Sequence, residues 1–246
     1  MTRARVLLVE DDPSIRRFVA LALEDLDLEL LEAASLAEAR LLLATGALRL
    51  LISDLMLPDG SGITLLQELA ADPARRAGAR LVAFSAGITA EKRAQLLALG
   101  VDEVLSKPVS LLALEDCVQR ALAGTAPASE AAPVPPSVVE QYFGGNQALY
   151  AAYRASCLAQ FVLDRQQGDQ AAAAGEMAAL RRLAHSLKSV LLTLGHGEAS
   201  RQAAALELTA EGADLEAAQA GWARLRNALV ALPPLLKAAL EQPAAP

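Results

Sequence analysis

The sequence of 246 residues has few aromatic residues, few cysteines and no excess of basic charge. Aromatic side chains make up 3% of the chain and apolar residues 54%, so its cores must be mainly aliphatic. Because the net charge is −7 and neither half of the chain is basic, we expect no direct binding to nucleic acid. The two cysteines, Cys117 and Cys157, lack metal or redox spacing, which favours reduced thiols in a cytoplasmic protein.

The chain also lacks a long apolar run and is poor in lysine and histidine. No uncharged apolar segment reaches the ~18 residues that a membrane-spanning helix needs, and the apolar run within Met1 to Glu10 is too short for a signal peptide. We therefore expect no membrane insertion. The sequence contains only four lysines and two histidines against 18 arginines. A lysine in such a chain indicates a position that needs a compact ammonium group.

Residues 1–123 alternate between short apolar segments and amphipathic ones. Apolar strands are predicted at residues 4–9, 28–33, 50–54, 81–85 and 101–105, and a helix follows each of them. Strands that alternate with helices pair in parallel through right-handed crossovers. The pattern therefore predicts an α/β domain with a doubly wound, five-stranded parallel sheet.

The second half of the chain has a different texture. Residues 124–137 are rich in proline and alanine and are expected to form a linker. Residues 138–246 show no strand pattern, and helices are predicted at about 147–166, 176–194, 198–211 and 214–240. Gly168-Asp169 is expected to begin a new segment, and Gly195-His196-Gly197 to break a helix. This half therefore predicts an all-α antiparallel four-helix bundle.

Polar residues follow several of the predicted strands of the first half. Glu10 and Asp11 come after the first strand, Asp54 ends the third, Ser85 the fourth, and Lys107 follows the fifth. The carboxyl ends of parallel strands share one edge of a sheet, so these side chains should gather there. Clustered carboxylates repel one another unless a cation joins them, and all-oxygen ligands suit Mg²⁺. A nucleophilic carboxylate, a metal, a hydroxyl and an ammonium together are typical of phosphoryl transfer.

On these residues, the first half resembles a response-regulator receiver domain with a flavodoxin-like fold. The matching pieces are the acidic stretch after the first strand, Asp54-x-x-x-Pro58-x-x-x-Gly62, Ser85, and Lys107-Pro108. The resemblance implies phosphorylation at Asp54 and Mg²⁺ held by Asp11, Asp54 and the Met56 carbonyl, with Glu10 acting through water. It departs from the family at Val104, where members often carry an aromatic switch residue.

One histidine of the helical half has a distinctive neighbourhood. Lys188 and Ser189 lie three and four residues after His185, so all three share one helix face. An exposed imidazole there could accept a phosphoryl group on a ring nitrogen, and Lys188 could pair with its oxygens. The run Arg182-Leu183-Ala184-His185-Ser186-Leu187-Lys188-Ser189, with Gly195 beyond it, resembles a histidine phosphotransfer (HPt) domain. That family usually has glycine where this chain has Ser189.

Together these patterns lead to one hypothesis and two alternatives. The hypothesis is a two-component phosphorelay protein that accepts a phosphoryl group on Asp54 from a sensor histidine kinase. It would then exchange phosphoryl groups through His185 with its own receiver or another protein's. No ATP-binding kinase region is recognisable, so we expect a phosphotransfer protein rather than an ATP-dependent enzyme. The alternatives are a phosphorylation-regulated binding module and a phosphate sink, in both of which His185 is not a carrier.

Overall fold

The computed structural model describes residues 3–124, 137–212 and 214–241, and these fall into two compact units, Met1–Tyr153 and Arg154–Pro246. Nearly all of the linker expected at 124–137 lies outside the described residues. The domain boundaries expected at residues 123 and 138 come from a change in sequence composition, whereas the two units are separated where few contacts cross between them. The expected boundaries therefore stay a prediction. The division between the units falls inside a single helix.

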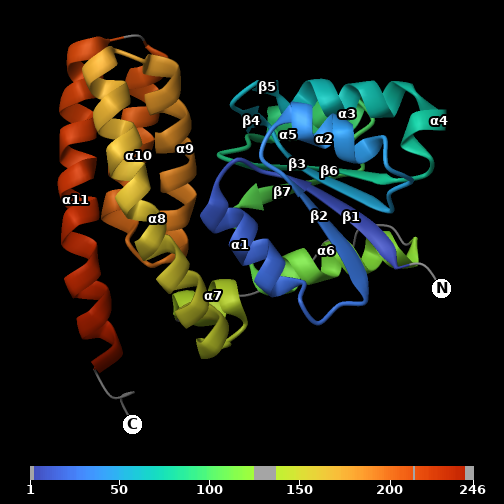
Figure 1. The fold of residues 1–246 in the computed structure, drawn as a ribbon, viewed down its shortest axis with the longest axis horizontal. Coiled ribbons are helices and arrows are strands. Elements are labelled where there is room, and N and C mark those ends of the chain that lie inside the picture. The colour runs from blue at the N-terminus through green and yellow to red at the C-terminus, as the bar shows by residue number, and fades with distance from the viewer. Residues whose placement is uncertain (1–2, 125–136, 213, 242–246) are drawn as a thin grey trace. The chain divides into compact units, whose positions relative to one another are not determined.

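The first unit is built on a parallel sheet with the strand order β2-β1-β3-β6-β7 (Figure 1). Its strands are β1 (Ala4–Val9), β2 (Leu28–Ala33), β3 (Leu50–Asp54), β6 (Arg80–Ala86) and β7 (Glu103–Lys107). Every residue of β3 is buried, which explains why this central strand reads as a continuous apolar run. The five-stranded doubly wound sheet predicted from the sequence is confirmed.

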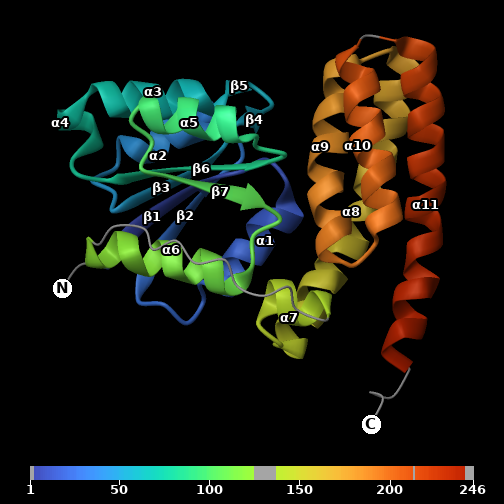
Figure 2. The same cartoon turned by 180° about the vertical axis from the view of Figure 1, so that it is seen from behind.

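Helices cover both faces of this sheet. The helices are α1 (Pro13–Ala22), α2 (Leu36–Leu43), α3 (Gly62–Ala71), α4 (Pro73–Arg76), α5 (Ala90–Ala98) and α6 (Leu111–Ala123). Figures 1 and 2 show α1 and α6 on one face and α2, α3 and α5 on the other. The aliphatic core on the second face includes Leu51 from β3, Leu66 from α3 and Leu96 from α5. This layering leaves the loops after the strands free to carry polar groups.

The turn between β3 and α3 forms a small hairpin that the sequence pattern does not predict. Its strands, β4 (Met56–Leu57) and β5 (Gly60–Ser61), pair antiparallel. Asp59 at its tip accepts hydrogen bonds from the backbone amides of Leu36 (2.8 Å) and Ala37 (2.9 Å) at the start of α2. The hairpin is therefore tied to a neighbouring helix, which fixes the backbone directly after Asp54.

An aromatic cluster joins α1 to a short helix that follows the parallel sheet in the chain. The helix α7 (Val138–Phe143) and the first turns of α8 (Gln147–Ala174) belong to the first unit. The ring of Phe18 on α1 meets Phe143 edge-on at 5.6 Å between centroids, and Tyr153 at the same distance. Tyr150 packs against Phe143 at 5.2 Å. In a chain with eight aromatic residues, four of them therefore lie at this one junction.

The second unit contains the remainder of α8 together with α9 (Met177–Thr193), α10 (Gly197–Glu211) and α11 (Leu215–Glu241). These helices lie side by side in both views, as a four-helix bundle should (Figures 1 and 2). The turn at Gly195, which has a φ of 85°, separates α9 from α10 as expected. Of the helices in the described ranges, none combines the length and apolarity that a bilayer span requires.

The expectation that Gly168-Asp169 begins a new segment is wrong, because α8 continues unbroken to Ala174. Gly168 is instead a point of close approach, since a Cβ atom there would lie 2.1 Å from the Trp222 ring. The indole nitrogen of Trp222 donates a hydrogen bond to Asp169 at 2.9 Å. Gly168 and Asp169, which look like a helix break in the sequence, therefore form the packing and hydrogen-bonding site for Trp222 of α11.

Candidate functional site

Asp54 is the last residue of β3, and its carboxylate is held by the chain that follows it. Its Oδ1 accepts hydrogen bonds from the backbone amides of Leu55 (2.5 Å) and Met56 (3.2 Å). Gly62 approaches from the end of the hairpin, where a Cβ atom would lie 1.7 Å from the Asp54 carbonyl oxygen. Only glycine fits at that point. The backbone around Asp54 is therefore fixed before any side chain contacts its carboxylate.

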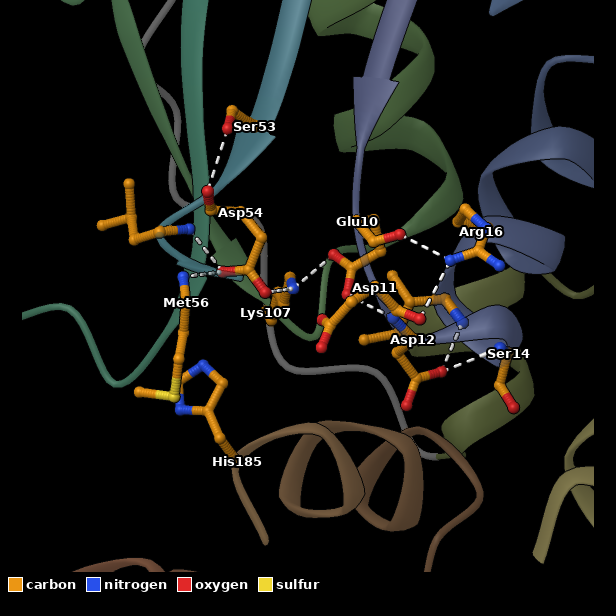
Figure 3. Close-up of polar contacts among 12 residues, drawn as sticks. Glu10, Asp11, Asp12, Ser14, Arg16, Ser53, Asp54, Met56, Lys107 and His185 are labelled. Atoms are coloured by element: carbon orange, nitrogen blue, oxygen red, sulfur yellow. Dashed lines mark hydrogen bonds and ion pairs between the residues drawn. The ribbon is translucent and has the colours of Figure 1, made fainter. Parts of the chain in front are cut away.

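Lys107 lies at the carboxyl end of β7 and bridges two acids (Figure 3). Its Nζ donates to Asp54 Oδ2 at 2.8 Å and makes a second, short bond to Glu10 Oε2. The three side chains are at most 2% exposed. Burial alone would lower the pKa of Lys107, but the charges of Asp54 and Glu10 outweigh it and raise that pKa. The ammonium is therefore a fixed positive charge beside Asp54.

The carboxylates of Glu10, Asp11 and Asp54 form one cluster at this edge of the sheet. Each offers an oxygen atom, and these atoms lie within 4.8 Å of one another. Burial and the neighbouring Asp54 charge raise the pKa of Asp11 to about 6, and burial also raises that of Glu10. The Oδ1 atom of Asp11 is buried without a hydrogen-bond partner in the described part of the chain. Such a donor set, oxygen only and short of positive charge, fits a hard divalent cation such as Mg²⁺.

Ser85, expected at the same edge, is a buried residue near the end of β6. In the strand register it lies one position beyond Phe84, which pairs with Asp54. The Phe84 ring packs against the Lys107 ammonium, 4.8 Å from ring centroid to Nζ. Val104 is buried in β7 and pairs with Ala83. An aromatic ring therefore contacts the lysine from β6, although the usual aromatic position on β7 is aliphatic.

The second unit holds a smaller polar group around His185 on α9. The His185 Nδ1 atom lies 2.7 Å from Glu207 Oε1 of α10, and Lys188 Nζ donates to Glu207 Oε2 at 2.5 Å. The sequence predicts His185 and Lys188 but not Glu207, which comes 22 residues later in the chain. One carboxylate therefore links the two residues that the HPt resemblance singles out.

Glu207 determines which nitrogen of His185 carries a proton. Burial would raise the pKa of Glu207, but hydrogen bonds from His185 and Lys188 prevail and lower it to about 2. An ionised carboxylate can only accept, so Nδ1 must be the donor. In the neutral imidazole the lone pair then lies on Nε2, which has no hydrogen-bond partner in the residues the structure describes. The group therefore offers Nε2 as its nucleophilic atom.

With both units of the chain present the His185 side chain is 6% exposed, and the expectation of an exposed imidazole on the helical unit itself stays a prediction. Glu207 contacts the His185 Nδ1 atom and also accepts a hydrogen bond from Lys188, and of these two neighbours the sequence pattern predicts only Lys188. Ser189, expected on the same outward face, is also buried. His196, at the N-terminus of α10, has a pKa lowered by burial and makes no side-chain cap, which agrees with its expected place in a helix break.

Comparisons with known proteins cover the first half of the chain. Residues 6–119 match the family model described as the response regulator receiver domain. Response regulator protein PilR of Pseudomonas aeruginosa is 36% identical over 134 residues, which is 54% of this chain and 29% of PilR. The KDP operon transcriptional regulatory protein KdpE of Escherichia coli is 36% identical over 117 residues, covering 48% of this chain and 50% of KdpE. The chain thus spans half or less of the length of these two relatives.

Solved structures match over the same part of the chain. A crystal structure of a putative response regulator from Chloroflexus aurantiacus covers 50% of this chain and 99% of its own, with 24% identity and a TM-score of 0.46. The family match, the sheet order and the acidic edge with its lysine all concern the same residues. The N-terminal part of this chain is therefore a response regulator receiver domain, the phosphorylation-controlled module of two-component signalling.

Proposed function

We propose that this protein is a two-component phosphorelay intermediate with two phosphoryl-carrying side chains, Asp54 and His185. The observation that carries the proposal is the bridge from Lys107 to Asp54 and Glu10, next to an Asp11 oxygen that has no partner. A second support is the carboxylate of Glu207, which leaves the lone pair of His185 on Nε2. The proposed partners are a sensor histidine kinase and the receiver or HPt domains of other proteins, and the proposed location is the cytoplasm.

In the first step, an Asp54 oxygen attacks the phosphorus of a phosphohistidine on the kinase. A P–O bond forms, the P–N bond breaks, and the imidazole leaves with a proton from solvent. Lys107 then exchanges its bond with Asp54 for one with a phosphoryl oxygen, and the Ser85 hydroxyl donates to another. Asp11, Asp54 and the Met56 carbonyl would hold Mg²⁺, with Glu10 acting through water. When bound, the ion neutralises charge on the phosphoryl oxygens.

In the second step, His185 Nε2 attacks the phosphorus of an aspartyl phosphate. A P–N bond forms, and the carboxylate of the donor aspartate leaves. Because the ring loses its lone pair on Nε2, it gains positive charge, which Glu207 stabilises through the Nδ1 proton. Lys188 can exchange its hydrogen bond with Glu207 for one with a new phosphoryl oxygen, since a carboxylate and a phosphoryl group are both anionic acceptors for an ammonium. The reverse transfer uses the same contacts.

The test is phosphoryl labelling of the full chain by a cognate kinase or a small phosphodonor. Asp54→Asn should remove the base-labile acyl phosphate, and His185→Gln should remove the base-stable, acid-labile phosphoramidate. The second histidine is a matched control, since His196→Gln should leave both signals in place. Undiminished labelling of a double Asp54→Asn, His185→Gln variant would refute the proposal.

One alternative is that phosphorylation of Asp54 regulates binding by the helical unit and that His185, held by Glu207, is only structural. The two functions differ in what His185→Gln does to signalling in the cell. A carrier histidine predicts loss of output after His185→Gln. Normal output in that variant, together with lost output after deletion of the second unit, residues 154–246, would support the binding module.

A further inference from the structure

Arg16 lies in the second turn of α1, behind the acidic edge of the receiver sheet. Its Nη1 atom donates to two backbone carbonyl oxygens, that of Glu10 at 2.6 Å and that of Asp11 at 2.9 Å. Figure 3 shows the two carbonyls turned toward Arg16, while the Glu10 carboxylate points the other way, toward Lys107. The same guanidinium lies 3.7 Å from Glu32 on β2.

The two carbonyls belong to the loop between β1, which ends at Val9, and α1, which begins at Pro13, so the backbone of neither element hydrogen-bonds them. The amide of Glu10 makes the last bond to β2, to the carbonyl of Ala33 at 2.9 Å, and α1 begins at Pro13, whose nitrogen carries no proton. Within the described residues, no backbone amide donates to the carbonyl of Glu10 or Asp11. The Arg16 side chain therefore supplies the hydrogen-bond donors that these two carbonyls do not receive from the strand or helix backbone, through two charge-assisted bonds.

We infer that Arg16 is a positioning residue for the cation pocket, because it ties back the Glu10 and Asp11 backbone so that both carboxylates face Asp54. This inference rests on the proposed function, in which these acids hold Mg²⁺. The ion pair with Glu32 does not explain the geometry, since it is long and the Glu32 side chain is 43% exposed. Among the described residues, no hydrogen bond or ion pair joins Arg16 to Asp54, so Arg16 acts through the loop.

The sign of the effect on cation affinity separates positioning from charge. Arg16 carries a positive charge near a cation site. If only this charge mattered, removing it should tighten Mg²⁺ binding, because less repulsion would act on the ion. If Arg16 positions the loop, its removal should weaken binding instead, because the acids must then be ordered when the ion binds. Groups that support metal ligands typically change affinity by about 10–100-fold, and we expect about tenfold weaker binding here.

The experiment is a titration of the ¹⁵N-labelled full chain with MgCl₂, followed by amide shifts at Asp11 and Met56. Arg16→Ala is compared with Arg17→Ala, which removes the same charge from the next residue, an exposed one. We expect weaker binding for Arg16→Ala and an affinity within about threefold of wild type for Arg17→Ala, since exposed charges are screened. Unchanged or tighter binding by Arg16→Ala would overturn the inference.

A second pair keeps the charge constant and remains available if Arg16→Ala does not fold. Arg16→Lys replaces the guanidinium with a shorter ammonium that reaches the carbonyls less well, whereas Arg17→Lys changes nothing near the pocket. Weaker Mg²⁺ binding by Arg16→Lys than by Arg17→Lys supports positioning, and equal binding contradicts it. If the amide shifts of the wild-type chain do not respond to MgCl₂, the Mg²⁺ site of the proposed function is refuted, and this inference falls with it.

Discussion

Replacing Glu207 with glutamine should destabilise the helical unit in a pH-dependent way. Glutamine keeps the size of the side chain but loses the charge that His185 and Lys188 share. A pKa lowered from 4.5 to about 2 corresponds to about 3 kcal/mol in favour of the ionised form at full strength. Because the side chain is 15% exposed and partly solvated, we expect a loss of about 1–2 kcal/mol at pH 7.

The pH dependence follows from the direction of this shift. The folded state lowers the pKa of Glu207, so its contribution is complete above pH 4.5 and is lost as the pH falls toward 2. The difference in unfolding free energy between wild type and Glu207→Gln should therefore shrink by roughly half between pH 7 and pH 3.

The assay is urea unfolding followed by tryptophan fluorescence. Trp222 is the only tryptophan of the chain and lies in the second unit, so its emission follows that unit alone. The control is Glu211→Gln one turn later on α10, whose partner is Arg181 in an exposed ion pair at 2.9 Å. That change should cost at most about 0.5 kcal/mol. An equal loss for Glu207→Gln at pH 7 and pH 3 would refute the assigned ion pair.

Three further predictions concern the first unit. Gly62→Ala should abolish phosphorylation of Asp54, measured by labelling, because the added Cβ would overlap the Asp54 carbonyl oxygen; normal labelling would contradict the close approach. Burial raises the pKa of the Cys117 thiol to about 12, so iodoacetamide at pH 8 should not modify it in the native protein, as read by mass spectrometry; rapid native modification would argue against this burial. Phe143→Ala should cost about 3–5 kcal/mol and speed amide hydrogen exchange in α1, whereas the exposed Leu112→Ala should do neither; equal exchange in both variants would show that the aromatic cluster does not stabilise α1.

The main features of the first unit could be predicted from the sequence because they depend on local periodicity and on strand ends. Apolar strands alternate with helices, and parallel pairing then brings Glu10, Asp54 and Lys107 to one edge without further information. The hairpin at Asp59 could not be predicted, because two-residue strands leave no periodic signal. Arg16 was not predicted either, since its partners are backbone carbonyls, which any sequence provides.

The second unit shows where pattern reasoning fails for helices. Gly168 looks like a helix break, yet it is a contact point for Trp222, and only the three-dimensional packing of α11 reveals this. Glu207 looks like one of many surface acids on an amphipathic helix. Its role depends on the rotation of α10 about its axis relative to His185, which helical periodicity leaves undetermined.

The aromatic cluster between α1 and α7 bears on how this protein can be shortened. The family match ends at residue 119, but the packed unit extends to Tyr153. A fragment that stops near Gly124 would leave the Phe18 ring, which is 4% exposed in the intact chain, facing water. Bare aromatic surface on a small domain promotes self-association. Dimers or aggregates of such a truncated receiver would then report the missing helix rather than a property of the native protein.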